Sequence, residues 1–431
     1  MMSSENILIE KFNIPKDVIF LLEKAEEDVR EEFKKVERIV EKNQYKILYA
    51  MQKNHLSDIH FNGTSGYGYG DIGRDTIEKI YSDIFSAEDA LVRPQIVSGT
   101  HAISLCLYAV LRPNDELISA CGTPYDTLAD VIGGKERNNN TGSLIDFGVK
   151  YKEIPLLEGG KIDIDKLLGA ISDKTKMVMI QRSKGYDFRN SLTINDIKNT
   201  IEKIKNKKKD LIVFVDNCYG EFTEELEPTD VGADLVAGSL IKNPGGGLSP
   251  TGGYVIGKKE LVKNAAYRLY APGIGKKVGP SLNINRLILE GLFLSPLIVG
   301  NALKGAIILS RIMEMLGYDV LPKFNESRTD IVQAVRFKTK EELITFIQSI
   351  QKGSPVDSHV VPEPWDMPGY NDQVIMAAGG FIQGASIELS ADAPIRKPYT
   401  AYIQGGLSYY QVKLSLMIAI NNMIEKGFIK I

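Results

Sequence analysis

The segment SGTH at residues 98–101 could bind an anion. It lies between an expected strand at 94–97 and an expected helix at 102–111. Backbone N–H groups at a helix N-terminus are free to bind a negative group, and the helix dipole adds to the attraction. The segment is therefore a candidate phosphate-binding turn. A plain structural turn is the alternative, because many strand-to-helix turns contain glycine.

An acidic residue follows the most continuous apolar run of the sequence. The run LIVFV at 211–215 is typical of a central strand buried on both faces, and Asp216 comes directly after it. Open α/β sheets bind their ligands at the carboxyl ends of their strands. A buried carboxylate needs a partner, and a protonated pyridine nitrogen would be one. A helix N-cap or a buried salt bridge is the alternative.

One lysine stands apart from the lysine-rich surface segment at 203–209. Lys242 lies in the segment SLIKNPGGG at 239–247, just before a proline and three glycines. The glycines let other groups approach the backbone closely. A lysine in a desolvated pocket can lose its proton and become a nucleophilic amine. The alternative is a lysine in a surface loop.

An aromatic residue completes this set. Tyr125, in CGTPYDT at 121–127, follows a turn at a strand end, where it could stack on a flat heteroaromatic ring or only pack. The order along the chain is an anion-binding turn, an aromatic residue, a strand-end acid and a lysine. This order is more specific than any one member, and a single cofactor would explain all four.

The elements that must position these residues alternate between short apolar runs and helical patterns, which is typical of an α/β fold with a mostly parallel sheet. We expect strands at 90–97, 116–119, 177–181, 211–215 and 253–256, and helices at 102–111 and 194–205. A charged helical stretch covers 14–57, a Gly/Tyr loop follows at 62–71, and a long helix is expected at 287–316. The expected division is a helical arm with the loop (1–70), a large domain (71–300) and a smaller α+β domain (301–431).

Composition excludes several classes of protein. The chain has 431 residues, 43% of them hydrophobic and 25% charged, as in ordinary folded proteins of two domains. A net charge of −3 argues against a nucleic-acid binder. Three cysteines without CxxC spacing and four histidines without an HExxH pair predict neither a disulfide framework nor a metal site. The N-terminus lacks a signal-peptide pattern, and charged and polar residues interrupt 287–316, so we expect a cytoplasmic protein without a membrane span.

At these segments the sequence resembles the pyridoxal-phosphate enzymes of fold type I, the aspartate aminotransferase-like fold. Within them it is most similar to the methionine gamma-lyase-like family, also called aluminium resistance proteins and related to the cystathionine lyases. The resemblance covers the chain from about residue 61 to the C-terminus. It is carried by the segments GYGYGDIGRDT (66–76), RPQIVSGTHA (93–102), SLIKNPGGG (239–247) and YIQGGLSY (402–409).

The resemblance implies roles for the candidate residues. Lys242 would form a covalent imine with pyridoxal phosphate, Asp216 would keep the pyridine nitrogen protonated, and Tyr125 would stack on the ring. The phosphate would contact Gly99 and Thr100, mainly through backbone N–H groups. Further cofactor contacts are expected from Ser98, Ser239, Asn217 and Tyr69, while His101 either contacts the ligand or caps its own helix.

The sequence departs from the family in one place. Typical members use a Tyr-x-Arg pair from the neighbouring subunit to hold the phosphate. Here Tyr69 matches the tyrosine but Asp71 stands where the arginine is expected, so the arginine's role is absent or moves, for example to Arg74. Tyr69, or Tyr67, would still complete a neighbour's site, which implies a homodimer or homotetramer.

Substrate contacts come from other parts of the chain. A substrate carboxylate needs a planar two-pronged donor, and Arg396 is the expected one, with Tyr67 as a second substrate contact. Arg182 and Lys184 are second-line candidates. Cys218, beside Asp216, has no histidine near it in sequence and is expected to be a buried, unreactive thiol.

The expected function is that of a pyridoxal-phosphate-dependent carbon–sulfur lyase. Elimination from a sulfur amino acid, of the cystathionine beta-lyase or methionine gamma-lyase type, would give a 2-oxo acid, ammonia and a thiol. The same residues could instead support transamination, racemisation or aldol cleavage. A cofactor-binding protein without turnover is the remaining alternative.

Overall fold

The computed structural model describes residues 3–133, 141–367 and 372–431. Its contacts divide the chain into two units, Lys42–Ser295 and a second unit made of Met1–Glu41 with Pro296–Ile431. The division expected from the sequence differs, because residues 1–41 group with the C-terminal part and residues 42–70 with the large sheet. An amphipathic stripe predicts that a helix packs on a core, but it does not identify which core.

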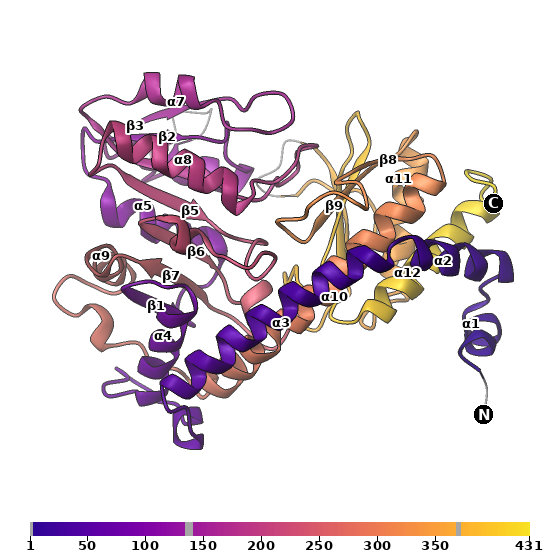
Figure 1. The fold of residues 1–431 in the computed structure, drawn as a ribbon, viewed down its shortest axis with the longest axis horizontal. Helices are drawn as coiled ribbons and strands as arrows, with labels where there is room; N and C mark the ends of the chain where they lie inside the picture. Colours follow the sequence, from indigo (N-terminus) through magenta and orange to yellow (C-terminus); the bar gives the residue numbers. More distant parts are fainter. Residues whose placement is uncertain (1–2, 134–140, 368–371) are drawn as a thin grey trace. The chain divides into compact units, whose positions relative to one another are not determined.

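The unit Lys42–Ser295 is built on a seven-stranded sheet with the order β1-β7-β6-β5-β4-β2-β3 (Figure 1). Strands β3, β2, β4, β5 and β6 pair in parallel, and β7 and β1 add antiparallel pairs at one end. The strands are β1 (Asp89–Arg93), β2 (Glu116–Ser119), β3 (Lys150–Glu153), β4 (Thr175–Gln181), β5 (Ile212–Asp216), β6 (Leu235–Ser239) and β7 (Gly253–Gly257). The mostly parallel α/β sheet expected from the sequence is confirmed.

Helices and short 3-10 turns connect these strands. The helices are α4 (Ile72–Ile84), α5 (Gly99–Val110), α6 (Asp126–Ile132), α7 (Ile164–Ala170), α8 (Ile194–Lys207) and α9 (Lys259–Leu269). The 3-10 turns are η1 (Asp58–Phe61), η2 (Pro228–Val231), η3 (Asn243–Gly245) and η4 (Gly275–Lys277).

Strand β1 is shorter than expected. The sequence predicted a strand through 90–97, but β1 ends at Arg93 and residues 94–95 form a turn, in which the N–H of Ile96 donates to the carbonyl of Arg93. Pro94 has no N–H to donate to the sheet, so the ladder stops there. The expected strand at 94–97 is therefore wrong, and a loop leads into helix α5.

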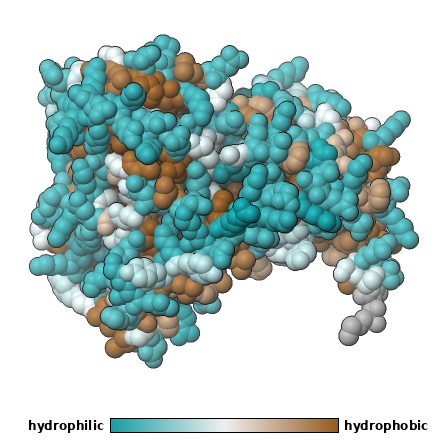
Figure 2. All heavy atoms as spheres, viewed as in Figure 1, coloured by the Kyte–Doolittle hydropathy of each residue, from teal (hydrophilic) through white to brown (hydrophobic). Residues whose placement is uncertain are grey.

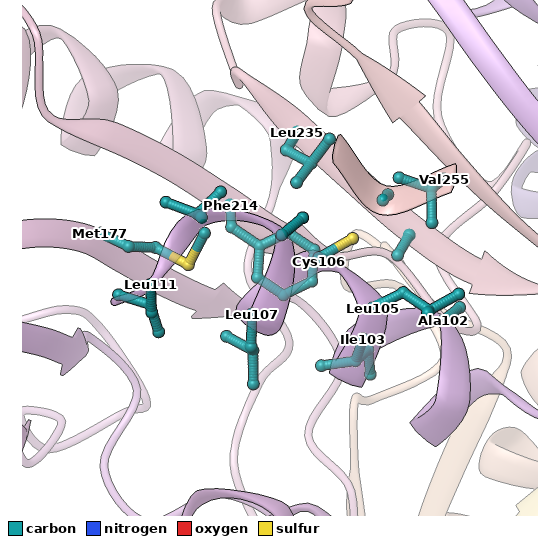
Figure 3. Close-up of a cluster of buried hydrophobic side chains, with 14 of the residues drawn as sticks. Ala102, Ile103, Leu105, Cys106, Leu107, Leu111, Met177, Phe214, Leu235 and Val255 are labelled. Carbon is teal, nitrogen blue, oxygen red and sulfur yellow. The ribbon is translucent and has the colours of Figure 1, made fainter. Parts of the chain in front are cut away.

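Helix α5 packs its apolar side chains on the sheet. Figure 3 shows Phe214 of β5 surrounded by Cys106 and Leu107 of the helix, by Leu111 directly after it and by Met177 of β4. All of these side chains are buried. Replacing Phe214 with alanine would cost about 3–5 kcal/mol. This core fixes the start of α5 at the edge where the strands end.

The second unit contains a five-stranded antiparallel sheet with the order β10-β11-β12-β9-β8, and two helices, α11 and α12, that pack on each other. Its elements are α1 (Ser4–Phe12), α2 (Lys16–Asp28), β8 (Asp319–Leu321), β9 (Val332–Arg336), α11 (Lys340–Lys352), β10 (Val374–Ala377), β11 (Ser390–Pro394), β12 (Thr400–Gln404) and α12 (Tyr409–Glu425). The α+β character expected for this part is confirmed.

Two long helices contain the points at which the units divide. They are α3 (Arg30–Lys53) and α10 (Asn285–Met315), and the second confirms the long helix expected at 287–316. The expected helical stretch at 14–57 is two helices, because α2 ends at Asp28 and α3 begins at Arg30.

Helix α10 is more apolar than its charged and polar interruptions suggested. It has the length and hydropathy of a membrane span, with a mean hydropathy of 1.8, although 67% of its most apolar window is buried in the fold. The expectation that this stretch falls short of a span is therefore corrected, since Pro296 stays inside the helix. Burial of this extent is typical of core helices. On the face drawn in Figure 2, hydrophilic residues cover most of the surface, and hydrophobic ones form smaller groups.

Candidate active site

The strand ends of the large sheet bring the predicted chemical residues together. Asp216 ends β5, Ser239 ends β6, and Lys242 follows in the loop between β6 and β7. Gly99, at the start of α5, faces them. A Cβ atom at Gly99 would lie 3.1 Å from Cys218 Sγ, 3.7 Å from Ser239 Cβ and 3.9 Å from Lys242 Nζ. Residues far apart in the sequence therefore surround one point at the carboxyl edge of the sheet.

The turn at 98–101 is the N-terminus of helix α5. Ser98 caps the helix, because its Oγ accepts the N–H of His101 at 3.1 Å. The N–H groups of Gly99 and Thr100 have no acceptor among the described residues, as expected for the first turn of a helix. They are the free donors that an anion would need.

His101 supports the entry to the helix. Its Nδ1 accepts the N–H of Val97 at 3.3 Å. Burial lowers the pKa of His101, which keeps the ring neutral and able to accept this hydrogen bond. This contact fixes the residue before the N-cap Ser98, and both expected roles of His101, ligand contact and helix capping, stay predictions.

Asp216 is a buried acid without an ion-pair partner among the described residues. Only 4% of its surface is exposed, and its Oδ1 accepts the N–H of Cys218 at 3.1 Å. Burial raises the pKa of Asp216, and the attraction of Lys242 opposes the rise. Among the described residues it neither caps a helix nor forms an ion pair within 4 Å, so both alternatives to a ligand role are absent there.

Lys242 is half-buried and lies against an aromatic ring. Its Nζ is 3.9 Å from the ring centroid of Tyr219. Burial alone would lower the pKa of Lys242, but Cys218, Tyr219 and Asp216 raise it well above its usual value, so the amine is protonated in the protein alone. The surface-loop alternative therefore does not hold.

Tyr219 is a site residue that sequence reasoning missed. Its backbone has φ of 72°, a left-handed conformation that is uncommon for a residue with a side chain. Asn243 Nδ2 holds this strained loop by donating to the carbonyls of Tyr219, at 3.0 Å, and Glu221, at 2.9 Å. No sequence signal marks a left-handed tyrosine, although its place three residues after Asp216 made it a neighbour of the site.

The glycines after Lys242 let the backbone of helix α10 come close, as the sequence predicted. A Cβ atom at Gly246 would lie 2.3 Å from the carbonyl oxygen of Gly291, and one at Gly291 would lie 2.2 Å from that of Gly245. Gly246 also has φ of 53°. The loop that presents Lys242 therefore rests directly on the first part of α10.

A buried carboxyl group lies behind the same loop. Glu221 is fully buried, its Oε1 accepts the hydroxyl of Tyr254 at 2.6 Å, and its Oε2 has no partner among the described residues. Burial raises the pKa of Glu221 to about 8. The group is therefore neutral at pH 7, which lowers the cost of leaving one oxygen unpaired.

Tyr125 lies beside the anion-binding turn. Its hydroxyl is 3.1 Å from Thr100 Oγ1, which also contacts Thr127 Oγ1 at 3.3 Å. Burial raises the pKa of Tyr125, and the charges of Asp216 and Cys218 add to the rise, so its hydroxyl lies within electrostatic range of the strand-end acid. The structure thus brings Tyr125 together with Thr100 and Asp216, while its stacking role stays a prediction.

Asn217 and Arg182 form a structural network. Asn217 accepts from Arg182 at 2.8 Å and donates to Glu227 at 2.9 Å, so both ends of its amide are engaged. Arg182 is fully buried and also pairs with Glu224 at 2.9 Å. The geometry gives Asn217 and Arg182 the task of holding the loop after β5. A cofactor contact for Asn217 stays a prediction, and so does a site role for Lys184, which is also buried.

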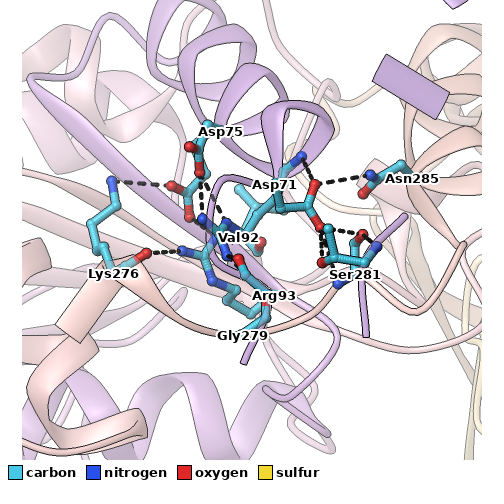
Figure 4. A network of polar contacts seen from close by, with 12 residues as sticks. Asp71, Asp75, Val92, Arg93, Lys276, Gly279, Ser281 and Asn285 are labelled. Carbon is cyan, nitrogen blue, oxygen red and sulfur yellow. Dashed lines mark hydrogen bonds and ion pairs between the residues drawn. The ribbon is translucent and has the colours of Figure 1, made fainter. Parts of the chain in front are cut away.

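The Gly/Tyr loop is anchored by Asp71 and Arg74. Asp71 caps α4, and in Figure 4 its carboxylate lies between Ser281 and Asn285. Arg74 donates to the carbonyls of Gly68, at 2.7 Å, and Gly279, at 3.0 Å. Both residues hold the loop through contacts within this chain, so the suggestion that Arg74 replaces the family's phosphate arginine gains no support.

Tyr67 and Tyr69 project from this anchored loop. Their rings stack with centroids 5.5 Å apart, and they are 68% and 67% exposed. Arg396 belongs to the other unit, where it pairs with Asp372 at 2.9 Å and its side chain is 55% exposed. The substrate roles of Arg396 and Tyr67 stay predictions.

The donor set fits pyridoxal phosphate. The free N–H groups of Gly99 and Thr100 suit a phosphate, the unpaired acid Asp216 suits a protonated pyridine nitrogen, and Lys242 offers an amine for the aldehyde. Gly99 leaves space between Cys218 and Lys242 that any side chain would fill.

A family model described as methionine gamma-lyase matches residues 18–424. The chain belongs to the methionine gamma-lyase family. Membership confirms the predicted class of enzyme, a pyridoxal-phosphate-dependent lyase, and the predicted cofactor.

Solved structures agree with this assignment. A candidate cystathionine beta-lyase involved in aluminium resistance from Clostridium acetobutylicum is 51% identical, with a TM-score of 0.95 over 98% of this chain and 99% of that chain. A carbon–sulfur lyase involved in aluminium resistance from Clostridium novyi NT is 50% identical, with a TM-score of 0.94 over 98% of this chain and 100% of that one. The pyridoxal-5'-phosphate-dependent protein YhfS from Escherichia coli, 15% identical over 90% of this chain and 97% of that one with a TM-score of 0.60, shows the same fold.

Proposed function

We propose that this methionine gamma-lyase family member is a carbon–sulfur lyase that acts on a sulfur amino acid and releases a thiol, ammonia and a 2-oxo acid. The observation that carries the proposal is the meeting of Lys242, Asp216 and the free N–H groups of Gly99 and Thr100 at one edge of the sheet. The names of the family and of the Clostridium novyi lyase support the carbon–sulfur chemistry.

The cofactor, when bound, supplies an electron-withdrawing ring that lets the substrate lose its α-proton and its carbon–sulfur bond. The residues of the chain would do the rest. The N–H groups of Gly99 and Thr100 would hold the phosphate, and Asp216 would keep a proton on the ring nitrogen. Lys242 would take up the α-proton at Nζ and return a proton later. A cationic ring beside this amine would lower its pKa and prepare it for that task.

Product analysis with the purified holoenzyme tests the proposal. L-cystathionine, L-methionine and L-cysteine are supplied one at a time, and thiol or sulfide, ammonia and 2-oxo acid are measured. We expect all three product types in equal amounts from at least one substrate, and none with Lys242→Ala. A 2-oxo acid without thiol would mean transamination, and a D-amino acid would mean racemisation. Either result, or unchanged turnover by Lys242→Ala, would contradict the proposal.

We also propose that Tyr67 and Tyr69 complete the site of a neighbouring copy in a homodimer or homotetramer. The support is their exposure on a loop that Asp71 and Arg74 hold rigid. Mixing two inactive variants, Lys242→Ala and Tyr69→Ala, and allowing their subunits to exchange tests this. If sites are shared, hybrid oligomers contain some intact sites and regain activity. No recovery after exchange proven by mass spectrometry would refute sharing.

A further inference from the structure

A cavity of about 430 Å³ opens at the carboxyl edge of the large sheet, among the loops that follow β2, β3 and β4. Its walls include Cys121, Thr123, Glu153, Asp187 and Arg189. The size lies in the range of small-molecule sites. None of these residues belongs to the cofactor contacts described above.

The cavity lies on the same edge as Asp216. Ala120 continues the pairing of β2 with β4 through a 2.9 Å hydrogen bond to Met179, and Gln181 of β4 pairs with Asp216 of β5. Cys121, which follows Ala120, is therefore two strands from Asp216, on the order of 10 Å. The same loop continues to Tyr125.

The charges that shift the pKa of Cys121 agree with a cavity close to the cofactor site. Burial raises the pKa of Cys121 to about 11, Arg189 opposes the rise and Asp216 adds to it. The thiol therefore lies within electrostatic reach of both the cavity's arginine and the acid of the cofactor site. A ligand held at Lys242 could extend toward Arg189 past this residue.

Arg189 is a buried cation, and some of its N–H groups are not used in hydrogen bonds among the described residues. Its side chain is 8% exposed, and its two terminal nitrogens each donate once, to the carbonyls of Asn190 and Ser183, both at 3.0 Å. Each of these nitrogens carries a second N–H. The acid within 4 Å of it among the described residues is Asp187, at 3.6 Å, and its side chain is 69% exposed. A fixed guanidinium with two remaining donors suits a carboxylate.

Glu153 supplies the opposite charge. Its carboxylate accepts from the hydroxyls of Thr123, at 3.2 Å, and Tyr151, at 3.4 Å. In the part of the chain that the structure describes, no lysine or arginine lies within 4 Å of it, and its neighbour Lys152 pairs with Glu116 instead. Hydroxyl donors do not neutralise a carboxylate, so Glu153 suits an ammonium group.

We propose that this cavity binds the distal end of the substrate, and that this end is itself an α-amino acid. Its carboxylate would bind Arg189 and its ammonium Glu153, with Leu156 and Leu157 of the wall against the connecting methylene groups. The inference rests on the proposed lyase function and narrows its substrate. The site favours a thioether with an amino acid at both ends, such as L-cystathionine, over one that ends in an alkyl group, such as L-methionine.

Steady-state kinetics of the holoenzyme test the proposal with two substrates, L-cystathionine and S-ethyl-L-cysteine. We expect Glu153→Gln and Arg189→Lys to lower kcat/KM for L-cystathionine by about tenfold to a hundredfold, mainly through KM. The first removes the charge that faces the ammonium group, and the second removes the two-pronged contact with the carboxylate. Turnover of S-ethyl-L-cysteine should change by less than about threefold, which is about the size of one weak contact. Glu158→Gln is the matched control, because Glu158 is exposed and does not line the cavity.

A binding measurement separates contact from turnover. Lys242→Ala loaded with pyridoxal phosphate is titrated with both amino acids in a calorimeter, with and without Glu153→Gln. We expect the second substitution to weaken L-cystathionine by about tenfold or more and to leave S-ethyl-L-cysteine unchanged.

The possible failures are distinguishable. Equal effects on both substrates, no effect on either, or a preference of the wild type for S-ethyl-L-cysteine would overturn the cavity proposal while the lyase function stands. Absence of thiol from every substrate would instead overturn the lyase function. If Arg189→Lys lowers the melting temperature strongly, Glu153→Gln, at an exposed residue, decides alone.

Discussion

Replacing Gly99 with alanine should separate the stability of the protein from its hold on the cofactor. The added methyl would lie 3.1 Å from Cys218 Sγ and 3.9 Å from Lys242 Nζ. Gly99 begins helix α5 and does not have a positive φ, so alanine can adopt its backbone conformation. Alanine favours a helix over glycine by up to about 1 kcal/mol, which offsets the small shift that the sulfur must make.

The added methyl would occupy space that the bound cofactor needs. Overpacking of a fitted site costs about 1–3 kcal/mol, which corresponds to about fivefold to a hundredfold weaker binding. The free energy of unfolding without cofactor should stay within about 1 kcal/mol of the wild type. The same substitution is thus neutral for the fold and harmful for the site.

Thermal unfolding of the apoprotein and titration with pyridoxal phosphate, followed by absorbance, measure the two quantities. Gly169→Ala is the matched control, because Gly169 is also helical and a Cβ there would meet nothing within 4 Å. If Gly99→Ala binds pyridoxal phosphate as tightly as Gly169→Ala does, the cofactor does not approach the start of α5 and the site is misplaced.

Three further predictions concern the acids. Asp216→Asn should lower kcat by about a hundredfold or more, because the amide still accepts from Cys218 but cannot keep the ring nitrogen protonated; unchanged kcat would refute this role. The pKa of Glu221 is about 8 in the folded protein against 4.5 usually, so the free energy of unfolding should fall by about 3–4 kcal/mol between pH 5 and pH 8. Glu221→Gln should abolish this fall in denaturant titrations; parallel pH profiles would contradict it. Asp71→Ala should destabilise the fold by about 2–3 kcal/mol in the same titrations, whereas Asp75→Ala, at a half-exposed ion pair, should cost less than about 1 kcal/mol; equal losses would refute the anchoring role.

The positions of Asp216 and Lys242 could be predicted because apolar runs and Gly/Pro segments mark where strands end. Parallel strands end at one edge, so an acid at the end of β5 and a lysine after β6 must lie close together. Ser239 and the turn at Gly99 followed from the same reasoning. For these residues local pattern and three-dimensional position agree.

Other features depend on contacts that the sequence does not mark. The left-handed backbone of Tyr219 is held by Asn243, 24 residues away. Asp71 and Arg74 look like part of a phosphate clamp in the sequence, yet their partners Ser281 and Gly279 lie more than 200 residues further along the chain. Such pairings become visible only when the chain is folded.

The contact of Gly246 with Gly291 has a consequence for how this enzyme can vary. Two peptide backbones touch there without any side chain between them, so the height of the Lys242 loop above α10 is set by main-chain geometry alone. Even a single methyl group at either glycine would push the Lys242 loop away from α10 and displace the amine. Side chains elsewhere around the loop can change in size because their neighbours can repack. At Gly246 and Gly291 only main-chain atoms are in contact, so no side chain can move to make room for a larger residue.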